Sequence, residues 1–288
     1  MREIEAGVLK VAYEETGSGL PVVLLHGFPY DAHAFDEVVP LLPGARVIVP
    51  YLRGYGPTRY LSNETLRSGQ QAALGADLLA FLDALKIPEA VLGGYDWGGR
   101  AACIVAALKP ERVSGLVTVN GYNIHDVPHA LEPSLPENEY RYWYQWYFQT
   151  ERGRAGLAKH RASLCKLLWQ LWSPKWKFSD ETYARTAASF DNPDFVDTVI
   201  HSYRARYGLT PNDPAYEAWE ALLTKRPPIT VPTIHLDGTA DGVLFLGGTA
   251  SQKSLFTGRY EYRTVEDAGH NIPQEKPAAF ADAVKALL

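Results

Sequence analysis

Short apolar runs recur along this chain and alternate with segments that have the residue spacing of helices. The runs Val22–His26, Ala45–Pro50, Ala90–Tyr95 and Val113–Val119 are almost continuously apolar, which is typical of strands buried on both faces of a parallel sheet. After the third run, Gly98–Leu108 has the pattern of a helix. Strands that alternate with helices predict a parallel α/β sheet with right-handed crossovers.

The alternation stops in the middle of the chain. Residues 122–228 contain no clear buried strand and instead hold aromatic, helix-leaning segments at Tyr140–Gly153 and Ser163–Trp172. Because aromatic-rich helices need a surface to bury against, we expect a helical cap at residues 123–228, inserted in an α/β core of residues 1–122 and 229–288. An independent middle domain is the alternative. The other expected elements are strands at Val8–Glu14, Thr233–Leu236 and Tyr260–Val265, and helices at His33–Leu42, Leu66–Leu85 and Pro277–Leu288.

The composition argues against several classes of function. The chain has 288 residues and a formal net charge of −5, so neither nucleic acid nor an anionic membrane is an expected partner. No apolar stretch approaches the roughly 18 residues of a membrane span, and the N-terminus lacks the pattern of a signal peptide. Cys103 and Cys165 stand far apart in apolar surroundings, which favours two free thiols and a reducing cytoplasm. The common metal-site spacings of histidine and cysteine do not occur.

The segment from Gly94 to Gly98, with the sequence GYDWG, lies where a predicted strand meets a predicted helix. A nucleophile on such a tight turn needs small neighbours, because other backbone segments come close. The N–H groups that open the following helix favour an anion there. Asp96 could be only the N-cap of that helix, but the flanking glycines favour a nucleophile that attacks a saturated carbon and forms an alkyl-enzyme ester. No G-x-S-x-G occurs elsewhere, which argues against a serine esterase.

Hydrolysis of such an ester needs a general base. His270 stands between the last predicted strand and the last predicted helix, and the chain order nucleophile, acid, histidine places the acid after the preceding strand. Asp237 and Asp241 both lie there. We prefer Asp241 because it sits deeper in the loop and can reach His270. Asn120, after an earlier strand, is the alternative location for the orienting group.

A second strand end carries the segment His26-Gly27-Phe28-Pro29. The backbone N–H of Phe28, together with that of Trp97, is expected to form an oxyanion hole for the ester hydrolysis. The alternative is a simple Gly-Pro turn with an aromatic plug.

These motifs resemble a known superfamily over nearly the full chain. HGFP, LRGYG at Leu52–Gly56, GYDWGG, the DGTADG loop and the AGH loop together resemble the α/β-hydrolase superfamily. The Asp-Trp pair is most similar to the epoxide hydrolases and the haloalkane and haloacetate dehalogenases, which use an Asp nucleophile, a His base and a second Asp. The resemblance implies an α/β-hydrolase fold, a mostly parallel sheet flanked by helices with an inserted cap. It also implies a cofactor-independent hydrolase.

The cap favours the epoxide hydrolases among these families. Soluble epoxide hydrolases use two cap tyrosines to hold the ring oxygen, and the resemblance points to Tyr144 and Tyr203, with Tyr142 and Tyr147 as alternatives. Fluoroacetate dehalogenases carry a His-Trp pair where this chain has Gln145-Trp146. The HGFP segment also lacks the Asn that haloalkane dehalogenases use for halide. The resemblance therefore implies an epoxide hydrolase, with a haloalkane or haloacetate dehalogenase as the alternative.

The expected partner is a small apolar epoxide, bound by side chains of Phe28, Trp97 and Trp146, in a monomer or homodimer with no metal. Two features depart from the family pattern. Tyr51 stands where an aspartate is usual before Leu52-Arg53, which changes how Arg53 is held. The loop at 242–246 is unusually apolar and is a candidate for part of the pocket wall.

Overall fold

The computed structural model covers residues 1–288 and describes all of them except 245–247. Among the described residues, one sheet runs in the order β1-β2-β4-β3-β6-β7-β8-β9, with β5 paired to β2 beside this path. Neighbours from β4 to β9 are parallel, whereas β1, β4 and β5 pair antiparallel with β2. The strands are β1 (Arg2–Ala6), β2 (Leu9–Thr16), β3 (Pro21–Leu25), β4 (Arg46–Pro50), β5 (Arg59–Tyr60), β6 (Ala90–Gly94), β7 (Val113–Val119), β8 (Thr233–Gly238) and β9 (Tyr260–Val265).

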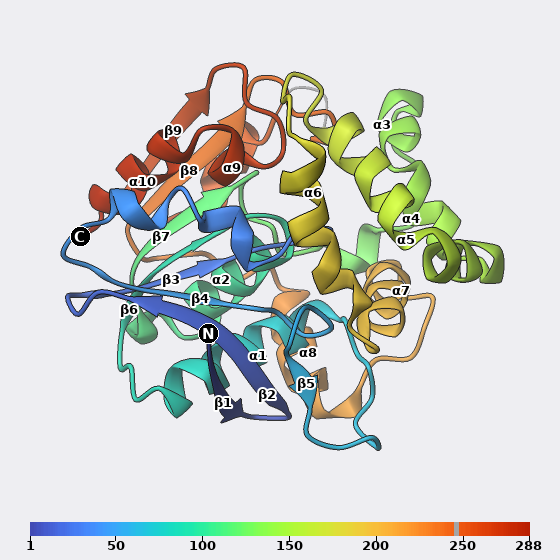
Figure 1. Ribbon diagram of the computed structural model, residues 1–288, viewed down its shortest axis with the longest axis horizontal. Helices are drawn as coiled ribbons and strands as arrows, with labels where there is room; N and C mark the ends of the chain where they lie inside the picture. The colour runs from blue at the N-terminus through green and yellow to red at the C-terminus, as the bar shows by residue number, and fades with distance from the viewer. Residues whose placement is uncertain (245–247) are drawn as a thin grey trace.

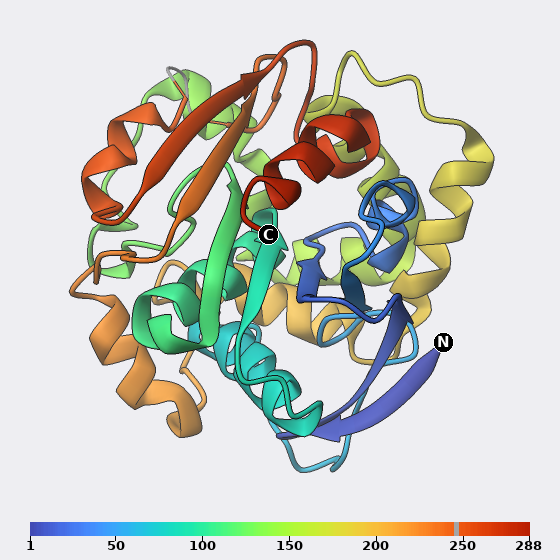
Figure 2. The same ribbon diagram turned by 90° about the vertical axis from the view of Figure 1, so that its left-hand side faces the viewer.

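The predicted parallel α/β core is confirmed. Strand β6 is buried along its whole length, and β3 and β7 are nearly so, because helices cover both faces of the sheet. Figure 2 shows α10 on one side of the sheet and the pair α1 and α2 on the other. The core helices are α1 (Gln71–Ala84), α2 (Asp96–Leu108), α9 (Ile272–Glu275) and α10 (Pro277–Lys285).

A helical region is inserted between β7 and β8 (Figure 1). Its aromatic side chains pack into the same hydrophobic cluster as the core. None of the described helices has the length and apolar character needed to cross a membrane. The inserted helices are α3 (Pro136–Arg141), α4 (Trp143–Phe148), α5 (Glu151–Trp172), α6 (Asp180–Ala187), α7 (Phe195–Ala205) and α8 (Glu217–Leu223).

Some elements differ from the sequence-based expectations. The helix expected at His33–Leu42 is two short 3-10 turns, η1 (Ala32–Phe35) and η2 (Val39–Leu41). The helix expected from Leu66 begins only at Gln71. Strand β1 was not expected, because its residues are mostly polar and only its last residue is buried.

The carboxylate of Asp31 ties the core to the inserted helices. Asp31 is fully buried and accepts hydrogen bonds from Thr186 Oγ1 at 3.0 Å and Ser189 Oγ at 2.6 Å. On the core side its Oδ2 lies 3.0 Å from Nδ1 of His33. Two hydroxyl groups of the inserted region therefore donate hydrogen bonds to a buried carboxylate of the core.

The structure also resolves how Arg53 is held without an aspartate at position 51. Arg53 is buried and forms a two-point ion pair with Asp77 of α1, with both nitrogen–oxygen distances at 2.6 Å. Tyr51 is buried as well, and its ring packs edge-on against His33. The carboxylate that balances Arg53 therefore comes from a helix rather than from the strand end.

Candidate active site

The junction of β6 and α2 is a tight turn. Strand β6 ends at Gly94, α2 begins at Asp96, and Asp96 has a positive φ of 50°. A Cβ atom at Gly94 would lie 2.6 Å from the backbone carbon of Gly98, and one at Gly98 would lie 2.1 Å from the carbonyl oxygen of Leu25. Both glycines are therefore needed for clearance, as the sequence pattern predicted. Asp96 is the first helical residue and not the N-cap of the helix, which is Tyr95.

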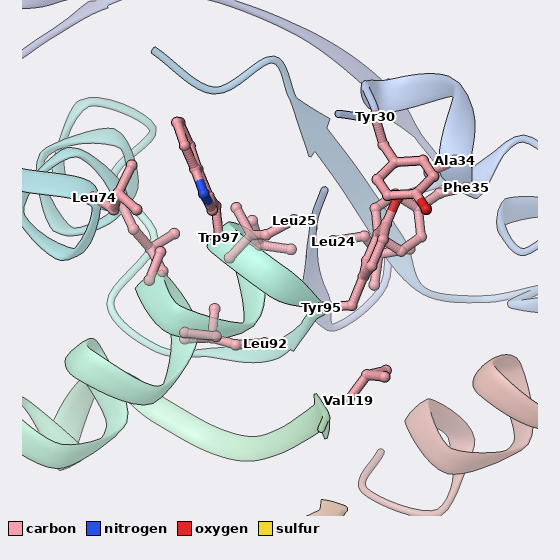
Figure 3. Close-up of a cluster of buried hydrophobic side chains, with 14 of the residues drawn as sticks. Leu24, Leu25, Tyr30, Ala34, Phe35, Leu74, Leu92, Tyr95, Trp97 and Val119 are labelled. Carbon is pink, nitrogen blue, oxygen red and sulfur yellow. The ribbon is translucent and has the colours of Figure 1, made fainter. Parts of the chain in front are cut away.

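The residues on either side of Asp96 anchor the turn in the core. Figure 3 shows Tyr95 and Trp97 pointing to opposite sides of the start of α2, with Tyr95 beside Tyr30 and Trp97 on the side of Leu74. Tyr95 and Trp97 are fully buried. The Asp96 side chain, in contrast, lines a large cavity.

The two carboxylate oxygens of Asp96 face different groups. Oδ1 accepts a hydrogen bond from the backbone N–H of Phe28 at 2.7 Å. Oδ2 lies 3.7 Å from Nε2 of His270. Burial alone would raise the pKa of Asp96, but the neighbouring His270 outweighs it, and the net shift is downward. Asp96 is therefore ionised at neutral pH.

His270 stands between two carboxylates. Its Nδ1 lies 2.9 Å from Oδ2 of Asp241, on the side of the ring opposite to Asp96. Asn120 joins this group, since its Nδ2 donates to Oδ2 of Asp241 at 2.8 Å and lies 3.1 Å from Nδ1 of His270. Burial lowers the pKa of His270, but the charges of Asp241 and Asp96 outweigh this effect and raise it. The imidazole is thus held in its protonated form while both carboxylates are charged.

The alternative acid, Asp237, lies in a different cluster. It accepts hydrogen bonds from the backbone N–H of Thr249 at 3.0 Å and from the hydroxyl of Tyr262 at 3.0 Å, and it contacts His235 rather than His270. The structure thus brings Asp241, and not Asp237, to the imidazole.

A further carboxylate fixes the loop that carries His270. Glu275 accepts hydrogen bonds from the backbone N–H groups of Gly269 at 2.7 Å and Asn271 at 3.0 Å. These are the residues on either side of His270. Glu275 also accepts from Ser173 Oγ at 2.6 Å, so the end of α5 is attached to the same loop.

The two predicted cap tyrosines lie together near Asp96. The rings of Tyr144 on α4 and Tyr203 on α7 are 5.4 Å apart at nearly a right angle, and Tyr203 packs edge-on against Phe28 at 5.4 Å. Burial raises the pKa of both phenols, and the charge of Asp96 adds to the rise in each. Both hydroxyls therefore remain protonated and within the electrostatic reach of Asp96.

The hydroxyls of this pair differ in their partners. The Tyr144 oxygen accepts from Nε2 of Gln145 at 3.0 Å, and Oε1 of Gln145 in turn accepts from the Tyr207 hydroxyl at 2.7 Å. The Tyr203 hydroxyl is buried and bonds to no described residue. Of the alternatives, Tyr142 lines the cavity, whereas the hydroxyl of Tyr147 lies against Gly156 on α5.

A cavity of about 550 Å³ lies at this site, and Asp96, Asn120, Tyr144, Trp146 and His270 are among its lining residues. The other two side chains expected to bind substrate, Phe28 and Trp97, are fully buried and stack on each other with ring centres 6.0 Å apart.

The apolar loop after Asp241 lies partly in this wall. Val243 and Leu244 line the cavity, while Phe245 and Leu246 lie outside the described residues. Among the described residues, no group of three His, Cys, Asp or Glu side chains is arranged to hold a metal ion.

Sequence reasoning missed several residues of the site. Arg100, Arg206 and Gln145 all line the cavity. Arg100 follows Asp96 by one helical turn, so the sequence could have predicted that the two side chains lie on the same face of the helix. Gln145 lies on α4 and Arg206 directly follows α7, so their positions depend on how the inserted helices pack.

Comparisons with known proteins agree with this geometry. A sequence profile of the α/β hydrolase fold matches residues 21–277. A crystal structure of a candidate epoxide hydrolase from Klebsiella pneumoniae is 47% identical, with 99% of this chain and 96% of that chain covered and a TM-score of 0.97. Epoxide hydrolase A of Mycobacterium tuberculosis is 26% identical, over 100% of this chain and 96% of its own length. An AB hydrolase superfamily protein of Bacillus subtilis is 28% identical, over 94% of this chain and 90% of its own length. This chain therefore belongs to the α/β-hydrolase fold family, and within that family it is similar to epoxide hydrolases.

Proposed function

We propose that this chain is a cofactor-independent epoxide hydrolase that converts an epoxide to a diol through an alkyl ester on Asp96. Oδ1 of Asp96 is bound by the Phe28 amide, so Oδ2 is the oxygen that attacks a ring carbon. The carbon–oxygen bond of the ring breaks, and its electron pair stays on the ring oxygen. The hydroxyls of Tyr144 and Tyr203 donate to that oxygen as it becomes an alkoxide.

The second step hydrolyses the ester. Water attacks Cγ of Asp96 while Nε2 of His270 takes its proton, and the charge that develops on Oδ1 is stabilised by the amides of Phe28 and Trp97. Esterification removes one of the two negative charges beside His270, so the pKa of the imidazole falls and the neutral base becomes available. Asp241 and Asn120 keep the ring oriented, and the proton taken from water balances the one delivered to the alkoxide.

The observation that carries this proposal is the pair of protonated cap tyrosines near Asp96. A strongly basic alkoxide needs proton donors as it leaves, whereas a halide needs only weak hydrogen bonds. Gln145 supports the pair, because it donates to the Tyr144 oxygen and so leaves the phenolic proton free to be donated elsewhere. The named epoxide hydrolases among the relatives add to this support.

A dehalogenase is the second candidate, and one observation favours it. The indole N–H of Trp97 is buried and bonds to no described residue, which is what a halide-binding donor requires. Incubation of the purified protein with styrene oxide and, separately, with chloroacetate and fluoroacetate separates the two. We expect diol from the epoxide and no halide release above the buffer rate. Halide release without diol formation would contradict the proposal.

A further inference from the structure

Two arginines form part of the cavity wall beside Asp96. Arg100 lies one turn after Asp96 on α2, and Arg206 directly follows α7 of the inserted region. Arg100 is 5% exposed and Arg206 is half-buried. Both line the large cavity that holds Asp96, and both also line a small cavity of about 20 Å³ next to it. Core and cap thus each contribute one guanidinium group to the same wall.

Neither guanidinium group has a carboxylate partner among the described residues. Nε of Arg100 donates to the backbone carbonyl of Asn123 at 3.1 Å, while its buried Nη1 has no hydrogen bond to any described residue. Nε of Arg206 is also buried and has no hydrogen bond within the described part of the chain, and its guanidinium lies 4.7 Å from the centre of the Tyr203 ring. By contrast, the buried Arg53 outside this cavity has its ion pair with Asp77.

The carboxylates near these arginines are engaged elsewhere. Glu220 lines the small cavity, but its oxygens accept from the side chains of Gln70 and Gln71 and from the backbone N–H of Ala72. In the large cavity, Asp126 lies beside His129 and Arg226. Glu139 accepts from the Trp146 indole at 2.7 Å. Glu132 is at the exposed rim.

The positive charge of this wall lowers the pKa values of neighbouring basic groups. The pKa of His125, which lines both cavities, is held well below its usual range by burial and then by Arg100 and Arg206. Burial and then Arg206 lower the pKa of Arg100 to about 10. The two guanidinium groups are thus close enough to repel each other.

The charges around the reacting atoms do not balance. Asp96 and Asp241 carry the negative charges, and they face the imidazolium of His270 and two guanidinium groups, so one positive charge remains. An uncompensated guanidinium in a poorly hydrated site is costly. Its fork of N–H donors matches the two oxygens of a carboxylate. The free space beside both side chains lies in the cavity that would hold the substrate.

We propose that Arg100 and Arg206 bind a carboxylate of the substrate, so that the molecule opened at Asp96 is a short epoxy acid and not a wholly apolar epoxide. This inference rests on the proposed function and narrows its substrate class. The carboxylate would lie between core and cap, and it would hold the ring carbon against Oδ2 of Asp96.

The test compares two pairs of compounds that differ only in charge. For turnover, 3-phenyloxirane-2-carboxylate is compared with its carboxamide. For binding, 3-phenylpropanoate is compared with 3-phenylpropanamide by calorimetry, which needs no chemistry. We expect the wild-type enzyme to prefer the carboxylate by at least about tenfold in kcat/KM and in Kd, the scale of a charge-assisted hydrogen bond.

Substitutions of the two arginines test whether these residues cause the preference for carboxylate over amide. In Arg206→Gln and Arg100→Gln the ratio between carboxylate and amide should fall towards one, and a general loss of activity would not move this ratio. Arg226→Gln is the matched control, because Arg226 lines the same cavity but lies beside Asp126. It should keep the ratio.

Equal binding of acid and amide by the wild-type enzyme would overturn the inference, as would a preference that survives in Arg206→Gln. Diol formation from the carboxamide at the same rate as from the acid would overturn it too, while leaving the epoxide hydrolase proposal intact. If the acid binds preferentially but neither epoxide is opened, the anion site stands and the proposed function fails.

Discussion

Nε2 of His270 lies 3.7 Å from Oδ2 of Asp96, on the side of the imidazole opposite to Asp241. The separation is longer than a direct hydrogen bond, yet both partners are almost fully shielded from solvent. The protonation state of His270 is therefore set by two carboxylates, and only one of them, Asp96, changes its charge in the proposed reaction.

The first prediction concerns this electrostatic coupling. Asp96→Asn removes one negative charge beside His270, so the pKa of the imidazole should fall. NMR titration of the 15N-labelled imidazole measures the change, with Asp237→Asn as the control that leaves it in place. Esterification of Asp96 during turnover removes the same negative charge and lowers the pKa of His270 in the same direction. Ester hydrolysis should therefore speed up as pH rises through this lowered pKa. An unchanged pKa in Asp96→Asn would contradict the coupling.

The second prediction separates the two chemical steps. His270→Gln should still alkylate Asp96, because attack on a saturated carbon needs no base, and should then accumulate the ester. Mass spectrometry of rapidly quenched enzyme should find the adduct on the peptide containing Asp96. If this variant forms no adduct in a single turnover, His270 has another role.

The third prediction distinguishes the two loop aspartates. Asp241→Asn should slow ester hydrolysis by roughly 10²–10⁴-fold, because Asp241 orients and stabilises the imidazolium. Asp237→Asn is the matched control, since Asp237 bonds to Thr249 and Tyr262. Single-turnover kinetics of the decay of the ester measures both. An equal effect in the two variants would contradict the assignment of Asp241.

The fourth prediction concerns the cap tyrosines. Tyr144→Phe and Tyr203→Phe each remove one proton donor and little volume, so each should slow ring opening by roughly 10–10³-fold. Pre-steady-state tryptophan fluorescence with an aryl epoxide follows the alkylation. Tyr147→Phe is the control, because the Tyr147 hydroxyl lies against Gly156 on α5. Wild-type alkylation rates in both single variants would favour the dehalogenase.

The fifth prediction concerns stability and the Asp31 contacts. Asp31→Asn should destabilise the protein by about 1–3 kcal/mol, because two hydroxyl donors lose a charged acceptor. The Asp31 contact raises the pKa of His33 above its ordinary value of 6.5. This part of the stability is therefore present below pH 6.5 and is lost as pH rises through the raised pKa. The Tm of the wild-type protein should exceed that of Asp31→Asn by more in mild acid than in mild alkali. An equal Tm difference at the two pH values would contradict this.

The sequence was sufficient to predict the fold and to single out candidate side chains that the structure brings together. The buried runs and the G-x-D-x-G turn depend on local rules, and strands β3, β4, β6 and β7 and the start of α2 agree with them closely. The structure brings Asp96, Asp241 and His270 together as expected. Their catalytic roles stay predictions.

What the sequence could not predict depends on tertiary packing. The sequence offered Asn120 as an alternative to Asp241, but the two side chains bond to each other because β7 and β8 are neighbours in the sheet. Arg100 and Arg206 are more than 100 positions apart, and the fold brings them to one wall. The carboxylate that balances Arg53 lies on a helix 24 residues further along the chain. The tyrosine at position 51 therefore gave no indication of which acid pairs with Arg53.

The most direct test of the account is a single turnover with excess enzyme and an aryl epoxide in H₂¹⁸O. If Oδ2 of Asp96 attacks the ring and water then cleaves the ester at Cγ, the first diol takes its new oxygen from the enzyme. The account predicts an unlabelled first diol and ¹⁸O in the peptide that contains Asp96. A first diol that carries ¹⁸O, with an unlabelled Asp96 peptide, would mean that water attacks the epoxide directly and would contradict the ester mechanism.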